Sequence, residues 1–274
     1  MTQSALNQQL LKLERELGVE LFARTGRGVT PTYAGRVYLE SAGKIKEIRD
    51  ETYKILHDIS NIKRGEISIA YTPERGSRMF SRVYPEFHKL YPEITFRIYE
   101  ARIKRMEQLL VRRQVSIAFL GYFETPNPLF TYHCTMNEYM VLALPATHPL
   151  AYLAGERSWE TLPEIDLRLL EHDYFVLLTH ETLMRYMCDK AFQRAGFTPK
   201  CLFESTSSMT VVNMVRNQVG PGFFPQAYVE PDAPMVYFSV GKDMTWNLSA
   251  ATYRSAYLNK AERDLIDLYS REKL

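Results

Sequence analysis

The sequence predicts an α/β protein with two similar lobes, preceded by a mainly helical N-terminal region. Three observations lead to this prediction. Patterns typical of strands and helices alternate between residues 65 and 120, and the alternation returns between residues 174 and 224. The first 64 residues instead show apolar residues at the spacing of helices. Alternating strands and helices give parallel strands joined by helical crossovers, so each lobe is expected to contain an open sheet.

The first expected element is a helix over residues 4–17. Its apolar stripe is formed by leucines three and four residues apart, namely Leu6, Leu10, Leu13 and Leu17. Gly18 follows, as is common after the last residue of a helix. Residues 24–31, with glycines near the centre and β-branched residues on the flanks, predict a small hairpin. Between Arg24 and Arg36 there are three arginines and no acid, so this segment is locally basic.

A long helix is expected from residue 33 to about residue 61, with Thr32 as its N-cap. Its apolar residues follow a heptad seam through Ile45, Ile48, Thr52, Ile55, Ile59 and Ile62. Such a narrow stripe is better buried against a second long helix than within one chain, which predicts a dimer. Packing against the body of the same chain is the alternative.

Two α/β units are expected after residue 64. The first contains strands at 66–71, 94–99 and 115–120 and helices at 77–90 and 104–113. The second contains strands at 174–178, 201–204 and 222–224 and helices at 184–195 and 209–217. Small ligands tend to bind between two such lobes, at the carboxyl ends of the strands.

Composition and motifs exclude several classes of function. The 34 basic and 32 acidic residues leave a net charge of +2, so the chain as a whole does not attract polyanions. The three cysteines are too scattered for a disulfide framework, and adjacent His133 and Cys134 would point to opposite faces of a strand. Phosphate-loop, zinc-protease and nucleophile-elbow motifs are missing from the sequence. We therefore predict no cofactor, no metal and no enzymatic activity.

The sequence contains no apolar run of the ~18 residues that a membrane span requires. Its first residues also lack the basic and apolar regions of a signal peptide. We therefore expect no membrane partner and a cytoplasmic location.

The N-terminal residues resemble a known family. Residues 3–10 (Gln-Ser-Ala-Leu-Asn-Gln-Gln-Leu), 16–24 and 30–35 are similar to the recognition helix, the wing and the start of the linker helix of LysR-type transcriptional regulators. Weaker, collinear similarity to the effector domain of that family follows in residues 65–71, 85–94, 142–151 and 219–225. The family has two helices before the recognition helix, so the chain is expected to be N-terminally truncated.

The resemblance implies a two-lobed, periplasmic-binding-protein-like effector domain, preceded by a partial winged helix-turn-helix and a long linker helix. The expected boundaries are residues 1–32 for the partial DNA-binding domain, 33–63 for the linker and dimerisation helix, 64–135 with 238–274 for lobe I, and 136–237 for lobe II.

By the same resemblance, the N-terminal part of the recognition helix reads base edges in the major groove. The residues that match these positions, or that lie close enough to contact the DNA backbone, are Thr2, Gln3, Ser4, Asn7, Gln8, Lys12, Arg24 and Arg27. Amide side chains suit adenine, whereas the basic residues add affinity without specificity. The implied partner is a roughly palindromic double-stranded DNA operator, bound by a homodimer or homotetramer through Ile45, Ile48, Thr52, Ile55 and Ile59.

Regulators of this family take up a small effector, often an anion, between the lobes. The candidate contacts are Thr72, Ser77, Arg102, Thr179, His180, Thr206, Phe224 and Pro225. Strand ends and helix N-termini favour anions, although each hydroxyl is equally compatible with an ordinary helix cap. Glu74 and Arg75 are interpreted as a solvated charge pair beside the first loop.

Two other functions compete with an effector-responsive regulator. One is a cytoplasmic small-molecule-binding protein without effective DNA binding. The other is an enzyme on the same two-lobed scaffold, which is disfavoured because the candidate residues include no organised general base.

Overall fold

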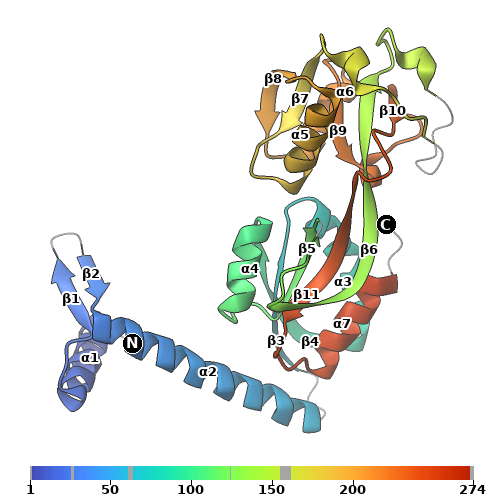
Figure 1. The fold of residues 1–274 in the computed structure, drawn as a ribbon. Coiled ribbons are helices and arrows are strands. Elements are labelled where there is room, and N and C mark those ends of the chain that lie inside the picture. The colour runs from blue at the N-terminus through green and yellow to red at the C-terminus, as the bar shows by residue number, and fades with distance from the viewer. Residues whose placement is uncertain (1, 26–27, 61–63, 124, 155–161, 272–274) are drawn as a thin grey trace. The chain divides into compact units, whose positions relative to one another are not determined.

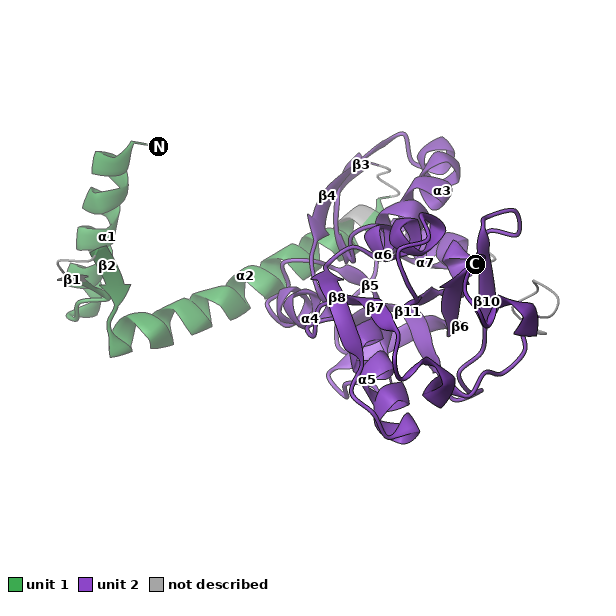
Figure 2. Ribbon diagram, turned by 90° about the horizontal axis from the view of Figure 1, so that it is seen from above, with its two compact units in different colours: residues 1–62 green, residues 63–274 purple. Residues whose placement is uncertain are grey.

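The structure is a computed structural model that describes residues 2–25, 28–60, 64–123, 125–154 and 162–271. The chain divides into two compact units, Met1–Ile62 and Lys63–Leu274, which are coloured separately in Figure 2. Within the described residues, no helix combines the length and the apolar character that crossing a membrane requires.

Unit 1 contains two helices and a two-stranded hairpin, close to the predicted positions. The elements are α1 (Gln3–Leu17), β1 (Phe22–Thr25), β2 (Gly28–Pro31) and α2 (Tyr33–Ile59). The Thr2 hydroxyl caps α1, and Gly18 ends it in the left-handed conformation at φ 69°. Thr32 caps α2 by accepting a hydrogen bond from the Gly35 N–H.

The hairpin is held to both helices around Leu21, the buried residue that precedes β1. Glu14 of α1 accepts hydrogen bonds from the N–H groups of Leu21 and Phe22, at 2.7 and 3.1 Å. The Leu21 carbonyl accepts from the Thr32 N–H at 2.9 Å. Gly35 lies so close that a Cβ at its position would meet the Leu21 carbonyl oxygen at 1.9 Å, so only glycine fits at this crossing.

Lobe I of unit 2 is an α/β unit with parallel strands. Its elements are β3 (Arg64–Tyr71), α3 (Arg75–Leu90), β4 (Glu93–Glu100), α4 (Ile103–Val111), β5 (Ile117–Tyr122) and the C-terminal α7 (Lys260–Arg271). Strand β3 pairs in parallel with both β4 and β5. Helix α3 begins two residues before the predicted start, so Ser77 lies inside its first turn.

Lobe II repeats the alternation. Its elements are β7 (Tyr174–Leu178), α5 (Leu183–Ala195), β8 (Lys200–Ser205), α6 (Ser208–Arg216), β9 (Gly222–Pro225) and β10 (Met235–Phe238), with short 3-10 helices η1 (Ala151–Leu153), η2 (Leu167–Leu170) and η3 (Gln226–Tyr228). Its core includes edge-to-face rings of Phe175, Phe192 and Phe223. The helix expected at 184–195 and the strand expected at 174–178 agree with α5 and β7.

Two long antiparallel strands, which the sequence analysis did not predict, connect the lobes. Strands β6 (Phe130–Pro145) and β11 (Thr245–Tyr253) run from one lobe into the other (Figure 1). The strand order is β4-β3-β5-β11-β6-β9-β7-β8, with β10 also paired to β6. The core of lobe II includes Val240, Met244 and Trp246. The second lobe I segment, expected to begin at residue 238, therefore begins closer to Trp246.

Candidate functional site

The exposed polar face of α1 carries most of the predicted DNA contacts. The Gln3, Ser4, Gln8 and Lys12 side chains are exposed, and Asn7 is half-buried. Thr2 is the N-cap of the helix and its hydroxyl accepts a hydrogen bond from the Ala5 N–H. These side chains lie in the first three turns of α1 and consist of amides, hydroxyls and one lysine.

The basic residues of the hairpin are described only in part. Arg24 lies in β1, with its Cα paired to that of Val29, but its side chain lies outside the described part of the structure, as does the whole of Arg27. Arg36, in the first turn of α2, donates to the Pro31 carbonyl at 3.1 Å. This bond ties one basic side chain to the end of the hairpin.

The predicted seam on α2 is exposed where it is described. Ile45 and Ile48 are 69% and 67% exposed, and Ile55 is 37% exposed. The Thr52 hydroxyl donates to the Ile48 carbonyl at 2.8 Å, so its polar group is satisfied within the helix. The side chains of Ile59 and Ile62 lie outside the described residues. Unit 1 therefore leaves an apolar stripe uncovered, as the dimer hypothesis requires.

The loops of the predicted effector site come together in pairs at the carboxyl ends of the parallel strands. In lobe I, the Ala101 N–H donates to the Tyr71 carbonyl at 3.0 Å and so joins the ends of β4 and β3. In lobe II, the Thr179 N–H donates to the Ser205 carbonyl at 2.9 Å and joins the ends of β7 and β8. Arg102 of lobe I forms an ion pair with Glu181 of lobe II, which links the two pairs of loops.

A second link between the lobes starts at Glu74, the N-cap residue of α3. Its carboxylate accepts hydrogen bonds from the Ser207 hydroxyl and, at 3.3 Å, from the Met209 N–H at the start of α6. The next residue, Arg75, donates to Glu138 of β6 at 3.0 Å. The interpretation of Glu74 and Arg75 as a solvated pair is therefore wrong, because each side chain binds a partner elsewhere in unit 2.

Glu138 is a charged residue in a buried part of β6. Its side chain is 1% exposed, against 15% for that of Arg75. Burial raises the pKa of Glu138, and the Arg75 charge and hydrogen bonds from Arg75 and Trp246 oppose that rise. Burial also raises the pKa of the nearby Tyr228 to about 12. The base of the site is thus poorly solvated, and charges within it interact strongly.

A cavity of roughly 30 Å³ lies beside Arg75. It is lined by Thr72, Arg75, Gly76, Met79, Phe119, Leu120, Gly121, Leu248 and Tyr269. The Nη2 atom of Arg75 is buried and has no hydrogen-bond partner among the described residues. Thr72 is the predicted residue that reaches this cavity. Gly76 is required nearby, because a Cβ there would meet the Tyr71 side chain at 2.5 Å.

Two other predicted residues of the site, Phe224 and Pro225, differ from the expectation. Phe224 is fully buried in the core of lobe II, with its ring edge-on to Tyr237, so we correct its role to packing. Pro225 is also buried, in β9, with its Cα paired to that of Met140. Ser77 is hydrogen-bonded to the Tyr71 side chain. Phe224 and Pro225 are thus buried in β9 of lobe II, whereas Ser77 lies in the first turn of α3 in lobe I.

The lobe II loop has its own charge network around Arg185. This buried guanidinium donates to Asp189 and to the Leu178 carbonyl, both at 2.8 Å, and also pairs with Glu204. The exposed His180 ring lies 2.9 Å from Arg185, between the same two carboxylates. The predicted residues Thr179 and Thr206 flank this network. The Thr179 hydroxyl is buried without a hydrogen-bond partner among the described residues, and Thr206 is exposed.

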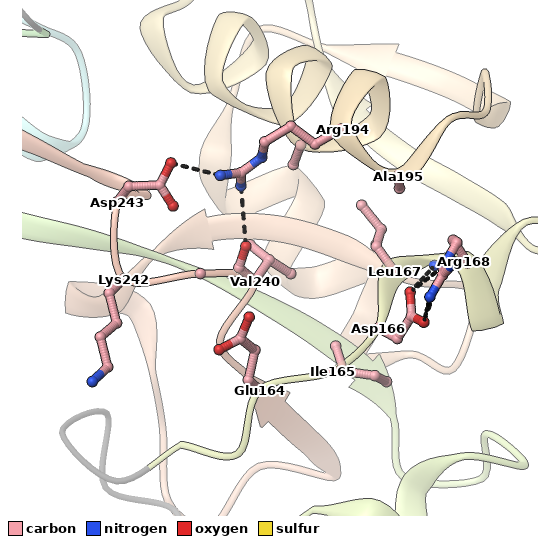
Figure 3. Close-up of a pocket in the computed structure, with 12 residues that line it drawn as sticks. Glu164, Ile165, Asp166, Leu167, Arg168, Arg194, Ala195, Val240, Lys242 and Asp243 are labelled. Atoms are coloured by element: carbon pink, nitrogen blue, oxygen red, sulfur yellow. Dashed lines mark hydrogen bonds and ion pairs between the residues drawn. The ribbon is translucent and has the colours of Figure 1, made fainter.

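A separate open hollow lies on lobe II, between η2, the end of α5 and residues 240–243 (Figure 3). Its charged lining residues bind one another: Arg194 pairs with Asp243 and donates to the Val240 carbonyl, and Arg168 pairs with Asp166. Because four of its charges are already neutralised, this hollow is a weaker candidate for a ligand than the loops at the strand ends.

Glu138 and Glu181 were not predicted from the sequence, and the interpretation of Glu74 and Arg75 was wrong. A single signal for Glu138 was available, since it is an acid directly before the apolar run of residues 139–145. Glu181 lies next to the predicted His180, but the lobe I partner that it binds cannot be read from spacing along the chain.

Comparison with known proteins places this architecture in a family. Residues 60–273 match the LysR substrate binding domain, and residues 1–36 match the bacterial regulatory helix-turn-helix protein of the lysR family. A probable RuBisCO transcriptional regulator of Cyanophora paradoxa is 28% identical over 225 residues, which are 81% of this chain and 66% of that protein. The match thus spans slightly less than two thirds of that relative's length.

Solved structures share the fold. The effector binding domain of QuiR in complex with shikimate has a TM-score of 0.61 at 18% identity, covering 76% of this chain and 96% of that one. Full-length CbnR complexed with its target DNA has a TM-score of 0.61 at 17% identity, covering 99% and 90%. The predicted two-lobed α/β fold is confirmed, and the matched families and the relative are regulators rather than enzymes. The chain belongs to the LysR family of bacterial transcriptional regulators.

Proposed function

We propose that the chain binds DNA through α1 and responds to a small-molecule effector bound at the strand ends of unit 2. The observation that carries the proposal is the arrangement of unit 2: polar loops at the strand ends of both lobes are linked across the lobes by Glu74–Ser207 and Arg102–Glu181. A ligand that changes these links changes how the lobes sit on the β6 and β11 strands. Access to DNA implies the cytoplasm as the proposed location.

The proposed DNA contacts are the exposed polar side chains at the start of α1. Gln8 and Asn7 present amides that suit adenine in the major groove, whereas Lys12 adds phosphate affinity. Titrations in a salt series from about 50 to 200 mM would separate these roles, because phosphate contacts set the slope of log affinity against log salt.

The DNA experiment uses fragments selected from a genomic library by the full chain. The Gln8→Ala variant is expected to reduce the preference for selected over random DNA by about 1–3 kcal/mol. Lys12→Ala should weaken binding to both DNAs and lower the slope by about 1. Lys89→Ala is the matched control, since it removes the same charge from α3 in unit 2. Equal binding of selected and random DNA by the unmodified chain would refute the proposal.

We further propose that α2 forms the dimer interface and that the effector is an anion. The exposed stripe of Ile45, Ile48 and Ile55 supports the dimer, because a partner helix would remove these side chains from water. The Glu74 carboxylate bound at the start of α6 supports an anionic effector, since the same Ser207 and Met209 donors could bind the carboxylate of a ligand.

A further inference from the structure

The first turn of α3 reaches across unit 2 at three successive points. Glu74 binds the Ser207 hydroxyl and the Met209 N–H of lobe II. Arg75 pairs with Glu138, in the β6 strand that connects the lobes. Arg78 donates to the Ala227 carbonyl of lobe II at 3.1 Å. One short segment of lobe I therefore makes polar contacts with α6, with the connecting strand and with η3.

The backbone at Glu74 has an uncommon conformation that directs this segment. Glu74 has φ 61° and ψ −72°, and the Arg75 N–H donates to the Pro73 carbonyl at 2.7 Å. This is a γ-turn of the kind with positive φ, which is strained for any residue other than glycine. The fold retains a glutamate in this turn, where its carboxylate contacts lobe II.

The receiving side of the contact belongs to lobe II alone. Ser207 is the N-cap of α6, and its Oγ also accepts a hydrogen bond from the Thr210 N–H at 3.1 Å. The Glu74 carboxylate thus accepts hydrogen bonds from the capping hydroxyl and from the Met209 N–H. The acceptor comes from lobe I and both donors come from lobe II, so these two hydrogen bonds join the lobes.

We propose that Glu74 is an intramolecular ligand that holds the two lobes together, and that an incoming effector anion displaces its carboxylate from Ser207 and Met209. The proposal rests on the proposed function of unit 2 as an effector-binding unit. It assigns to the effector a carboxylate or similar oxyanion, and it makes Glu74 a built-in competitor of that effector.

The test uses the full chain with Glu74→Gly, because glycine adopts the positive φ without strain and removes only the side chain. Propionate is the probe, since it has the length and charge of the glutamate side chain that is removed. Hydrogen–deuterium exchange of a peptide covering residues 207–212 reports protection of the α6 N-terminus. Glu66→Ala is the matched control, as it removes a lobe I carboxylate whose ion pair, with Arg97, lies within that lobe.

We expect about tenfold faster exchange of this peptide in Glu74→Gly than in the wild type, and restored protection in the presence of propionate. Propionamide, the neutral analogue, should not restore it. Propionate should bind Glu74→Gly at least about tenfold more tightly than the wild type, in which Glu74 competes for the same donors. Glu66→Ala should leave the exchange of this peptide within about twofold of the wild type.

Unchanged exchange in both Glu74→Gly and the isosteric Glu74→Gln would overturn the proposal. Equal propionate affinity of the wild type and Glu74→Gly would overturn it as well. Both measurements are made without DNA, so they test the role of Glu74 separately from the proposed function. If the proposed function is wrong, selective DNA binding is absent while the Glu74 results stay as expected.

Discussion

Replacing Arg75 by methionine tests how strongly the buried charge pair stabilises unit 2. Methionine keeps most of the side-chain volume but removes the guanidinium that lies 3.0 Å from Glu138. Glu138 is 1% exposed, so the variant leaves its carboxylate in a poorly solvated place with the Trp246 hydrogen bond as its remaining support. Breaking one side of such a pair is costly because the remaining charge loses its compensation.

The expected loss is about 3 kcal/mol in the free energy of unfolding, at the low end of the range for buried pairs because Arg75 is 15% exposed. The control is Arg97→Met, which breaks the Arg97–Glu66 pair between β4 and β3. That pair has a similar distance, 3.1 Å, but its side chains are 60% and 43% exposed. Solvent screens such a pair, so the control should lose less than about 1 kcal/mol.

Urea unfolding followed by tryptophan fluorescence and by circular dichroism measures both variants. The double variant Arg75→Met/Glu138→Gln should recover part of the loss, because it no longer buries an uncompensated charge. The reasoning is refuted if Arg75→Met loses no more stability than Arg97→Met, or if the double variant is less stable than Arg75→Met alone.

Three further predictions can be tested by standard measurements. Gly35→Ala should destabilise unit 1 by more than about 2 kcal/mol because its Cβ meets the Leu21 carbonyl, whereas Gly43→Ala, with open space around it, should stabilise α2 by about 0.5–1 kcal/mol; thermal unfolding by circular dichroism decides the signs. Ile48→Asp should shift sedimentation from dimer to monomer, and an unchanged profile would contradict the seam. Because the pKa of Glu138 is raised above its ordinary value of 4.5, the folded protein keeps this proton at a pH where the unfolded chain has lost it. The stability of the wild type relative to Glu138→Gln should therefore fall as the pH rises from 4.5 through the pKa of the folded state. A relative stability that increases with pH would contradict the raised pKa.

Much of the fold could be predicted because it rests on local patterns. The apolar spacing of α1, the run of β7 and the helix α5 are each encoded within about fifteen residues, and their positions agree with the structure to within one residue. Strands β6 and β11 were missed for a physical reason. They cross from one lobe to the other, so their environment changes along their length and their burial does not follow a single alternation.

The site was harder to predict than the fold, because its partners are distant in the sequence. Thr72 was identified from its position at a strand end, which local pattern reveals. Glu74 and Arg75 bind residues 133 and 63 positions away, and spacing along the chain contains no information about such contacts. Phe224 follows the same strand-end rule as Thr72, but β9 lies inside the sheet of lobe II, so its side chain is buried in the core.

The charge balance of the site bears on the sign of the effector. Three arginines, Arg75, Arg78 and Arg102, and three glutamates, Glu74, Glu138 and Glu181, make the polar contacts between the lobes and with β6. An anion that entered while Glu74 stayed in place would add an unbalanced negative charge to a poorly solvated region, which is unfavourable. Exchange of the Glu74 carboxylate for that of the effector keeps the balance and frees the first turn of α3. A neutral effector would leave Glu74 bound to Ser207. If an uncharged ligand changes DNA binding while the α6 N-terminus stays protected from hydrogen exchange, the effector is not an anion that displaces Glu74.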